Sequence, residues 1–259
     1  MKKKLISSLI LLTSLTLSGC ASLDGPTDPS DPFERYNRSM DSFNSNVDSY
    51  VLKPVAKGYD AITPPFVQKG VGNFFSNLDD IQVIFNDLFQ FKFKQLASDT
   101  GRLVINSSVG VLGLIDWASD MGLEKHNEDF GQTLGYWGVS SGPYLILPLL
   151  GPSTVRDTGG LAVDSTYLDP INNEVHEQWV YPNRNRDASA GLTIVKVIDV
   201  RAGLLKAESV LNEAALDPYI YVREAFLQRR HNLIYDGSPP TESDFDSDDF
   251  FEEDDIFED

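Results

Sequence analysis

The segment DPFERYNRSMDSFNSNVDSY, residues 31–50, indicates how this chain folds. Its larger apolar residues recur at alternating steps of three and four positions, at Phe33, Tyr36, Met40, Phe43, Val47 and Tyr50. This spacing places them on one stripe of an α-helix. The Asp31-Pro32 pair before the stripe is a typical helix start, with Asp as the cap and Pro in the first turn, and Asp217-Pro218 repeats this pattern. The segment therefore predicts a long amphipathic helix.

Helical patterns continue after this segment. The pairs Lys53-Pro54 and Pro64-Pro65 interrupt them, and further helices are expected at residues 66–77, 78–93, 95–108, 188–214 and 218–235. Gly, Pro and polar residues make three stretches irregular, at 118–129, 130–160 and 167–186, and no strand series alternates regularly. We therefore predict an all-α fold with a single helical domain at residues 33–236.

Each apolar stripe has two interpretations. It can pack against other helices in a core, or it can lie against acyl chains in one leaflet of a membrane. For any single helix, packing in a core is our expectation. No segment after residue 19 contains the roughly 18–20 consecutive apolar residues that a membrane-spanning helix needs.

The N-terminus is typical of a secreted and acylated protein. Three lysines precede an apolar run at residues 5–17, and Leu17-Ser18-Gly19-Cys20 resembles a bacterial lipobox. Residues 1–19 are thus predicted to be a signal peptide, with Cys20 acylated and residues 20–32 forming a flexible linker. An ordinary cleaved signal with a chance cysteine is the alternative. Ala21, rather than Asp, after the cysteine favours the outer membrane of a Gram-negative bacterium.

The charge of the chain is concentrated at its C-terminus. The formal net charge is -18, and residues 237–259 contain eleven acidic residues without Lys or Arg. This segment is expected to be a disordered acidic tail. The remainder is only mildly acidic and has no basic surface for phosphates, which excludes a nucleic-acid partner.

One pattern suggests covalent catalysis. Gly138-Val139-Ser140-Ser141-Gly142 fits the G-x-S-x-G nucleophile elbow of hydrolases. His176 or His231 could act as the base, oriented by Asp164 or Asp169. Pro143 and the nearby glycines argue against the strand and helix that an elbow requires. A lipid-anchored esterase or lipase using Ser140 is therefore kept as the alternative function.

Metal-binding patterns are weak in this sequence. His126, Glu128 and Asp129 lie together without helical ligand spacing, so a solvated loop is the expectation. Four aspartates mimic a calcium loop, but the glycine that its turn needs is missing; these are Asp244, Asp246, Asp248 and Asp255. We expect neither a metal site nor a cofactor.

An apolar run at residues 144–150 differs from the polar chain around it. Gly142-Pro143 precedes it, Gly151-Pro152 follows it, and Pro148 interrupts it. The run is too short to span a membrane and poorly suited to the centre of a sheet. Arg156-Asp157 follows as an ion pair or loop clamp, unless the arginine contacts a phosphate head group.

Three groups of residues carry a resemblance to a known family. They are DPFERYNR (residues 31–38) with Met40 and Phe43-Asn44, then FGQTLG (130–135) with Gly142-Pro143-Tyr144, Leu147-Pro148, Gly151-Pro152-Ser153 and Arg156-Asp157, and finally Asp217-Pro218-Tyr219 with REAF (223–226) and Gln228-Arg229. In this order the chain resembles the MlaA (VacJ) family of outer-membrane lipoproteins. The resemblance covers about residues 31–235 and leaves out the acidic tail.

The resemblance implies a fold and a function. The fold is a ring of amphipathic helices in one leaflet, with Gly/Pro-rich loops around a central channel. The function is removal of mislocalised phospholipids from the outer leaflet toward a periplasmic lipid carrier, which maintains lipid asymmetry without enzymatic chemistry. The implied partners are phospholipids, the inner leaflet of the outer membrane, a trimeric porin and a periplasmic phospholipid-binding protein.

The same resemblance assigns a lipid-channel region within residues 130–157. The predicted residues are Phe130, Gly131, Gly142, Pro143, Tyr144, Leu147, Pro148, Gly151, Pro152 and Arg156. Irregular backbone at membrane depth is tolerated where protein or a water-filled cavity satisfies its polar groups. A hydrophobic loop lining or flanking a pore is one interpretation of residues 144–150, and packing inside a helical core is the other. A structural scaffold for porins, without lipid movement, is a third possible function.

Overall fold

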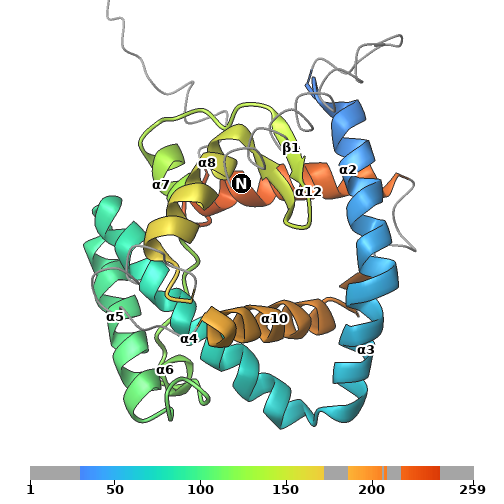
Figure 1. The fold of residues 1–259 in the computed structure, drawn as a ribbon. Helices are drawn as coiled ribbons and strands as arrows, with labels where there is room; N and C mark the ends of the chain where they lie inside the picture. Colours follow the sequence, from blue (N-terminus) through green and yellow to red (C-terminus); the bar gives the residue numbers. More distant parts are fainter. Residues whose placement is uncertain (1–29, 172–185, 206, 209–216, 240–259) are drawn as a thin grey trace, which may run out of the picture.

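Helices dominate the described part of the chain. The computed structural model describes residues 30–171, 186–205, 207–208 and 217–239 of the 259. Its helices (Figure 1) are α2 (Glu34–Val47), α3 (Lys53–Ile62), α4 (Pro65–Phe89), α5 (Phe93–Ser108), α6 (Trp117–Asp120), α7 (Phe130–Tyr136), α8 (Val155–Val163), α10 (Arg186–Gly203) and α12 (Pro218–Ile234). Strands β1 (Tyr144–Leu147) and β2 (Gly151–Thr154) form a two-stranded sheet. The predicted all-α class is confirmed, with this small sheet as an addition.

Several predictions concern residues outside the described ranges. They are the signal peptide at 1–19, Cys20 and most of the linker, His176, and the tail from residue 240 with its calcium-loop pattern. These remain predictions.

One side of the molecule is a nearly continuous helix formed by α2, a π-helical turn at Asp48–Leu52 and α3. The turn lies just before Pro54, which has no N–H and whose ring would clash with a carbonyl of the preceding turn. A π-turn, in which the Lys53 N–H donates to the Asp48 carbonyl, accommodates this proline. The expected interruption at Lys53-Pro54 is therefore wrong, whereas Pro64-Pro65 does separate α3 from α4.

The next element, α4, is one helix of 25 residues where the sequence pattern predicts two, at 66–77 and 78–93. That prediction is wrong because no proline interrupts this stretch. Its glycines are close to other segments, with Gly70 near Leu114 and Gly72 near Asp199. Packing there offsets the low helix propensity of glycine. A short turn after α4 leads into α5, which packs beside it and confirms the helix expected at 95–108.

The expected irregularity of residues 130–160 is wrong, because α7, β1, β2 and α8 form there. The strands pair in antiparallel register from Tyr144 opposite Thr154 to Leu147 opposite Gly151. Each strand has four residues, which is too short for alternation to stand out among the flanking Gly and Pro. Left-handed backbone at Leu149 (φ 64°) and Gly151 (φ 81°) closes the hairpin.

The two C-terminal helices are confirmed, α12 in full and α10 as far as Gly203, while residues 209–214 of the predicted range lie outside the described residues. α12 begins as predicted, since the Asp217 carboxylate accepts hydrogen bonds from the N–H groups of Tyr219 and Ile220. The same prediction at Asp31 is wrong. α2 begins at Glu34 without a side-chain cap, and Asp31 is fully buried.

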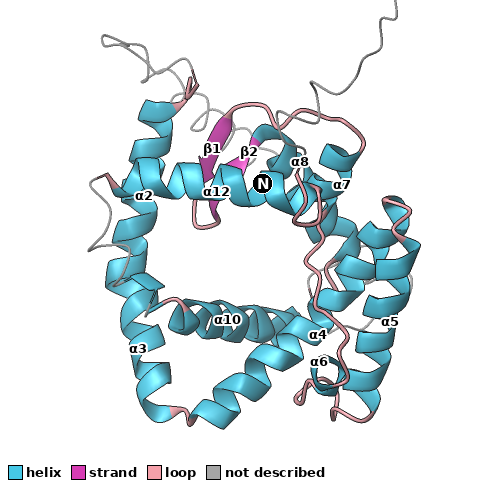
Figure 2. Cartoon of the chain, turned by 180° about the vertical axis from the view of Figure 1, so that it is seen from behind, coloured by secondary structure: helices cyan, strands magenta, loops and turns pink. Residues whose placement is uncertain are grey.

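The elements lie around the middle of the molecule like the sides of a frame (Figures 1 and 2). α2 and α3 form one side, α4 runs obliquely from the end of α3, and α12 lies at the opposite end with the β1–β2 hairpin, α7 and α8. α10 packs against α3 and α4. The turn of the hairpin is directed toward the middle. A lipid channel through the frame stays a prediction, because side chains also occupy the space between the helices.

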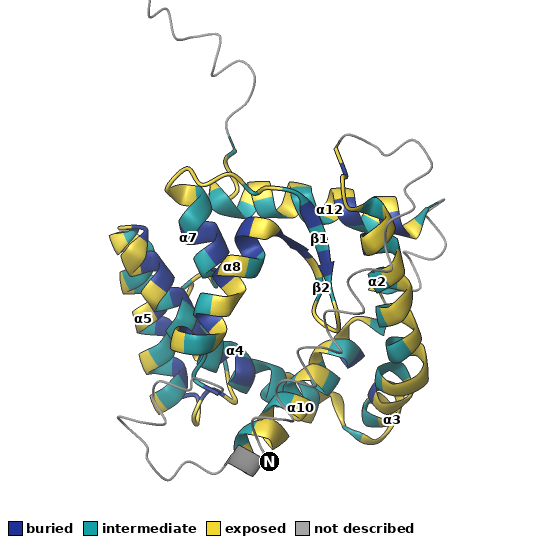
Figure 3. Cartoon of the chain, turned by 45° about the horizontal axis from the view of Figure 1, so that its top comes forward, coloured by how far each residue is buried: buried dark blue, intermediate teal, exposed yellow. Residues whose placement is uncertain are grey.

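The distribution of polarity is the reverse of that in most water-soluble domains. Nineteen polar or charged residues are buried in the described ranges, against ten apolar ones. The compact apolar core is a small cluster of Tyr144, Ile146 and Tyr219, with Met40, Phe226 and Leu227 packed against it. In contrast, 39 large hydrophobic residues are exposed, and exposed surface runs along the outer helices in Figure 3. Buried polar groups are normally a minority, so this molecule presents apolar surface and hides polar groups.

Candidate functional site

The first helix shows this reversal most clearly. In α2 the buried residue is Asn37, whereas four members of the predicted apolar stripe, Phe33, Tyr36, Phe43 and Tyr50, are exposed. Tyr50 is 81% exposed. Our expectation that the stripe packs into a core is wrong for these four residues, whereas Met40 of the same stripe packs against the apolar core. The helix uses its polar face to contact the protein.

Two asparagines on that polar face bind the free edge of β1. The Asn37 amide donates to the Tyr144 carbonyl (3.0 Å) and accepts from the Ile146 N–H (2.8 Å). Two turns later, Asn44 donates to the Leu147 carbonyl (2.9 Å) and accepts from the Leu149 N–H (2.7 Å). Each amide therefore replaces a missing neighbouring strand, which satisfies an edge that would otherwise be unpaired.

The beginning of the described chain is attached to α12 by a second polar group. The Asp31 carboxylate accepts hydrogen bonds from Asn37 (3.2 Å) and from the Tyr219 hydroxyl. Arg38 pairs with Asp217 (2.9 Å) and lies over the Tyr219 ring, 4.3 Å from its centroid. Burial, followed by the bond to Asp31, raises the pKa of Tyr219 well above its ordinary value. α2, β1 and α12 therefore form one junction.

A glycine pair lets α7 and α8 cross in close contact. A Cβ atom on Gly160 would lie 2.3 Å from the backbone nitrogen of Gly131. A Cβ atom on Gly131 would lie 2.6 Å from Asp157 Oδ1. Both positions therefore require glycine. The first of these glycines, Gly131, belongs to the FGQT segment.

A buried cluster of charges lies beside this crossing. Arg156 donates to Asp157 (3.0 and 2.9 Å), and Arg230 of α12 donates to Asp157 and Asp129 (2.9 Å each). Burial raises the pKa of Asp129, but the hydrogen bonds from Arg230 and Gln132 outweigh it and lower the pKa below its ordinary value. The predicted Arg156–Asp157 ion pair is confirmed. Arg156 makes its contacts within the protein, including a hydrogen bond to the Val139 carbonyl (3.3 Å).

A pair of acidic side chains lies between α4 and α5. Asp87 and Asp99 are both fully buried, and His126 Nδ1 lies 2.8 Å from Asp99 Oδ2. In the described ranges no nitrogen or hydroxyl donates to either Asp87 oxygen. Burial and then the neighbouring Asp99 raise the pKa of Asp87 to about 8. A protonated Asp87 can donate to Asp99.

An apolar loop after α5 is exposed although its polar anchors are buried. Arg102 donates to Asp116 (3.1 and 3.2 Å) and to Ser119 (3.0 Å), and Asn106 donates to Asp116 (2.9 Å). These bonds hold residues 109–116, of which Val109 and Leu112 are 65% and 69% exposed. Val111 has a φ of 55°, an unfavourable conformation for a β-branched residue. The loop is tightly built, yet it presents apolar side chains outward.

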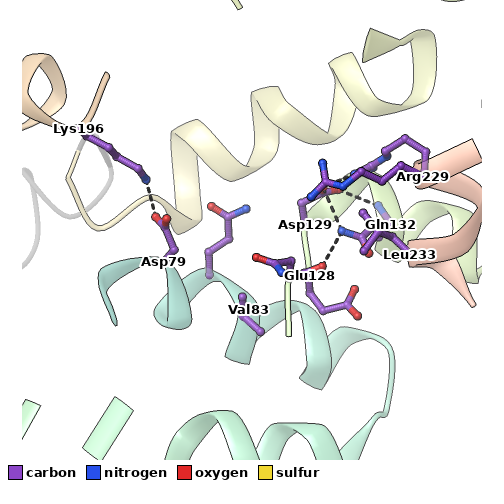
Figure 4. A pocket seen from close by; sticks show the side chains of 11 residues that line it. Asp79, Val83, Glu128, Asp129, Gln132, Lys196, Arg229 and Leu233 are labelled. Atoms are coloured by element: carbon purple, nitrogen blue, oxygen red, sulfur yellow. Dashed lines mark hydrogen bonds and ion pairs between the residues drawn. The ribbon is translucent and has the colours of Figure 1, made fainter. Parts of the chain in front are cut away.

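A polar cavity of about 290 Å³ lies where four parts of the chain converge. Asp79, Gln82 and Val83 come from α4, Lys196 from α10, and Arg229, Arg230 and Leu233 from α12, while residues 127–129 and Gln132 form the rest of the lining. Figure 4 shows Lys196 directed toward Asp79, with Arg229 on the opposite side. Six charged residues line this cavity, three of each sign.

No helix within the described ranges has the length and apolarity needed to cross a bilayer. The exposed apolar residues are instead spread over several helices and loops. Exposed apolar surface on this scale marks contact with a membrane or a partner.

Comparisons with known proteins identify the family. The family model described as MlaA lipoprotein matches residues 29–233. The chain belongs to the MlaA lipoprotein family. Within the MlaA family it is 37% identical over 240 residues to the Escherichia coli K12 protein named intermembrane phospholipid transport system lipoprotein MlaA, covering 90% of this chain and 89% of that one. A Haemophilus influenzae protein of the same name is 34% identical over 243 residues, with 92% and 93% covered.

A solved structure supports the same membership. It is reported as "Structural basis for maintenance of bacterial outer membrane lipid asymmetry" and matches with a TM-score of 0.65 at 35% identity. The match covers 79% of this chain and 99% of that one. The family match at residues 29–233 includes the described helices from α2 to all but the last residue of α12, and it ends before the acidic tail.

The residues that the MlaA resemblance assigned to a channel divide into two groups. Gly131, Tyr144 and Arg156 are buried in protein contacts described above, and Leu147, Phe130 and Pro143 are half-buried. Gly142, Pro148 and Pro152 are exposed, and Gly151 lies at the hairpin turn. Packing in a core is thus confirmed for Tyr144 and Ile146. A channel role for the region stays a prediction, with the hairpin tip as its accessible part.

The alternative esterase is overturned by the local structure. A nucleophile elbow needs a strand before the serine and a helix after it. Ser140 instead lies in an exposed connection from the end of helix α7 to strand β1, the reverse order. Of the suggested partners, Asp164 accepts from the Phe130 N–H (2.9 Å), and His231 stacks near the Tyr235 ring at 5.1 Å. The Escherichia coli and Haemophilus influenzae relatives are named for phospholipid transport.

The three candidate metal-binding residues contact other side chains of the protein. His126 contacts Asp99, Glu128 accepts from Gln90 (2.8 Å) and Lys92 (2.9 Å), and Asp129 accepts from Arg230. The solvated-loop expectation is wrong for Glu128, which is 5% exposed. Asn37, Asn44, Gly160 and Arg230 were not predicted as site residues, and only the separation of seven between the two asparagines could have indicated their shared helix face.

Proposed function

We propose that this chain is an outer-membrane lipoprotein that removes mislocalised phospholipids from the outer leaflet and passes them toward a periplasmic lipid carrier. The observation that supports this most directly is the reversed polarity, with apolar side chains outside and polar side chains inside. Its MlaA relatives are named for intermembrane phospholipid transport. Removal of these lipids would maintain the asymmetry of the outer membrane.

The exposed apolar residues favour a position within a leaflet. The stripe on α2, the loop at residues 109–116 and the hairpin tip at Leu149 and Leu150 would be costly to leave in water. Helices lying parallel to the membrane can bury such surface without spanning it. Acylation of Cys20 would hold the protein on the periplasmic side of the outer membrane, because lipid chains add to this apolar contact.

The polar interior favours movement of head groups. A charged head group loses its hydration in hydrocarbon, at a cost of many kcal/mol unless polar groups replace water. The cavity between α4 and α12 is lined by charged and polar side chains that could replace this water. The acyl chains could meanwhile stay in contact with apolar side chains. This process forms and breaks no covalent bond, so we propose no enzymatic activity.

The partners belong to the same proposal. A trimeric porin would provide a stable protein neighbour in the outer membrane, and a soluble phospholipid-binding protein would accept the lipid. A scaffold for porins is the rival function. It predicts the same porin contact without transfer of lipid.

The function is tested by measuring phospholipid on the cell surface. We expect a deletion strain to expose phospholipid to an amine-reactive reagent that does not enter cells, and wild-type protein to restore protection. Ser140→Ala should restore protection equally, because the serine lies in an exposed connection. Loss of protection with Ser140→Ala would support a hydrolase instead.

A second assay separates transport from scaffolding. Purified acylated protein is reconstituted with its porin in vesicles, and transfer of labelled phospholipid to a soluble acceptor is followed. We expect transfer to depend on this protein. Porin association without any transfer would contradict the proposal and support the scaffold.

A further inference from the structure

The polar cavity between α4, α10 and α12 contains one cation that no residue in the described ranges neutralises. Lys196 pairs with Asp79 (2.5 Å), and Arg230 pairs with Asp129 and Asp157. Glu128 pairs with Lys92 (2.9 Å). Arg229 is exposed and has no hydrogen bond or ion pair within the described ranges. The lining therefore has a guanidinium available to an anion.

Buried polar atoms in the same lining also have no partner. Gln132 is 2% exposed, and its Oε1 accepts no hydrogen bond from the described residues. The same holds for the donor Arg230 Nε. Buried polar atoms are rarely left unpaired, and each such case calls for an explanation. A ligand with both a donor and an acceptor would explain this pair.

The pair between Asp79 and Lys196 can open at little cost. Its side chains are 44% and 32% exposed, and exposed ion pairs contribute little to stability. Opening would free the Asp79 carboxylate, which lies on the other side of the cavity from Arg229 in Figure 4. The cavity would then have a cation at one end and an anion at the other.

We propose that this cavity binds the zwitterionic head group of a glycerophospholipid, with its phosphate on Arg229 and its ammonium group near Asp79 and the Gln132 carbonyl. An arginine binds a phosphate through two parallel N–H donors. The Asp79 carboxylate would favour a head group that has a positive charge beside its phosphate over one that has only negative charge. A volume of about 290 Å³ suits a head group, whereas a whole lipid requires more space. This inference rests on the proposed function, because it names the lipid class that is carried.

Two substitutions test the two ends of the site in the vesicle transfer assay, with donor vesicles containing labelled phosphatidylethanolamine or labelled phosphatidylglycerol. Arg229→Gln should lower transfer of both lipids about tenfold, the effect of one lost charge-assisted hydrogen bond. Asp79→Asn should lower transfer of phosphatidylethanolamine alone, by about threefold, and so change the ratio between the lipids. Lys94→Gln neutralises an exposed lysine outside the cavity and serves as the control.

Each outcome has a distinct meaning. If wild-type protein transfers neither lipid, the proposed function fails. If wild-type protein transfers lipid and Arg229→Gln or Asp79→Asn behaves like Lys94→Gln, the head-group site is overturned. Inorganic phosphate added to the assay separates the ligands, because equal inhibition by phosphate and by phosphoethanolamine would indicate a simple anion site and overturn the proposal. Far-UV circular dichroism and Tm confirm that the exposed substitutions leave the fold intact.

Discussion

Asn37 determines how α2 meets the hairpin. Its side chain makes hydrogen bonds to Asp31, Tyr144 and Ile146, and it is completely buried. Its amide thus makes the hydrogen bonds that a neighbouring strand would make, at a buried position that an apolar side chain usually occupies. Polar residues with this role are hidden in a sequence pattern, because asparagine on an amphipathic helix is ordinarily assigned to the solvent side.

Asn37→Ala is expected to reduce the free energy of unfolding by about 2–4 kcal/mol, because it leaves the Ile146 N–H and the Tyr144 carbonyl buried without partners. Chemical denaturation in detergent measures the change. Asn46→Ala is the matched control, since Asn46 is an exposed residue of the same helix that donates only to the Ser42 carbonyl. It should change stability by less than about 0.5 kcal/mol. Equal effects of the two variants would contradict the assigned role of Asn37.

Asp87 makes stability depend on pH in a direction opposite to most carboxyl groups. Its pKa is raised to about 8 in the folded protein by burial and by Asp99, against about 3.9 in an unfolded chain. Between these values the folded state holds a proton that the unfolded state has released. The contribution of Asp87 to stability is therefore full at acidic pH and is lost as the pH rises toward 8.

Asp87→Asn should remove this contribution to the pH dependence. Asparagine cannot ionise but can still donate to Asp99. We expect Tm of the wild-type protein to fall more steeply from pH 5 to pH 8 than Tm of Asp87→Asn, measured in the same detergent. Every other titratable group is the same in the two proteins, so the comparison of slopes isolates Asp87. Parallel curves would show that Asp87 is ionised throughout.

At the scale of elements, the crossing of α7 and α8 depends on the absence of side chains. Gly160 and Gly131 bring the two helices to backbone contact, and this contact places Asp157 beside Arg230 of α12. A change at the crossing would therefore move the charged cluster as well. The neighbouring Gly159 has nothing within 4 Å of its missing Cβ atom.

Gly160→Ala is expected to destabilise the protein by at least about 2 kcal/mol, because its Cβ atom would overlap the backbone of Gly131. Gly159→Ala adds the same methyl group one residue earlier, in open space. It should be neutral or stabilise by up to about 1 kcal/mol through reduced flexibility of the unfolded chain. Thermal denaturation of both variants provides the comparison. A Gly160→Ala protein as stable as Gly159→Ala would rule out the close crossing.

At the scale of the whole molecule, exposed apolar surface should bind membranes without the lipid anchor. Cys20→Ala removes the acylation site, while the stripe on α2 and the loop at residues 109–116 remain. We expect the purified variant to sediment with phospholipid vesicles, with an affinity about tenfold or more below that of the acylated protein. A variant that stays monomeric in buffer and does not sediment with vesicles would contradict a position within a leaflet.

The sequence by itself was sufficient for the family and for the longer helices. Periodicity and proline positions predicted α2, α5, α10, α12 and the cap at Asp217, and the order of motifs indicated the MlaA family that the comparisons confirmed. These features depend on residues close together along the chain. The sequence pattern did not predict α3 or the short elements α6, α7, β1, β2 and α8, and it divided α4 into two helices.

Only the tertiary structure decided which face of each helix is buried. Amphipathicity shows that a helix has two faces, but it does not show which one contacts protein. The buried amides of Asn37 and Asn44, the Gly131–Gly160 contact and the cavity beside Arg229 all join segments distant in sequence. Their partners exist only after folding, so a reversed arrangement, with polar groups inside and apolar groups outside, could not be read from the order of residues alone.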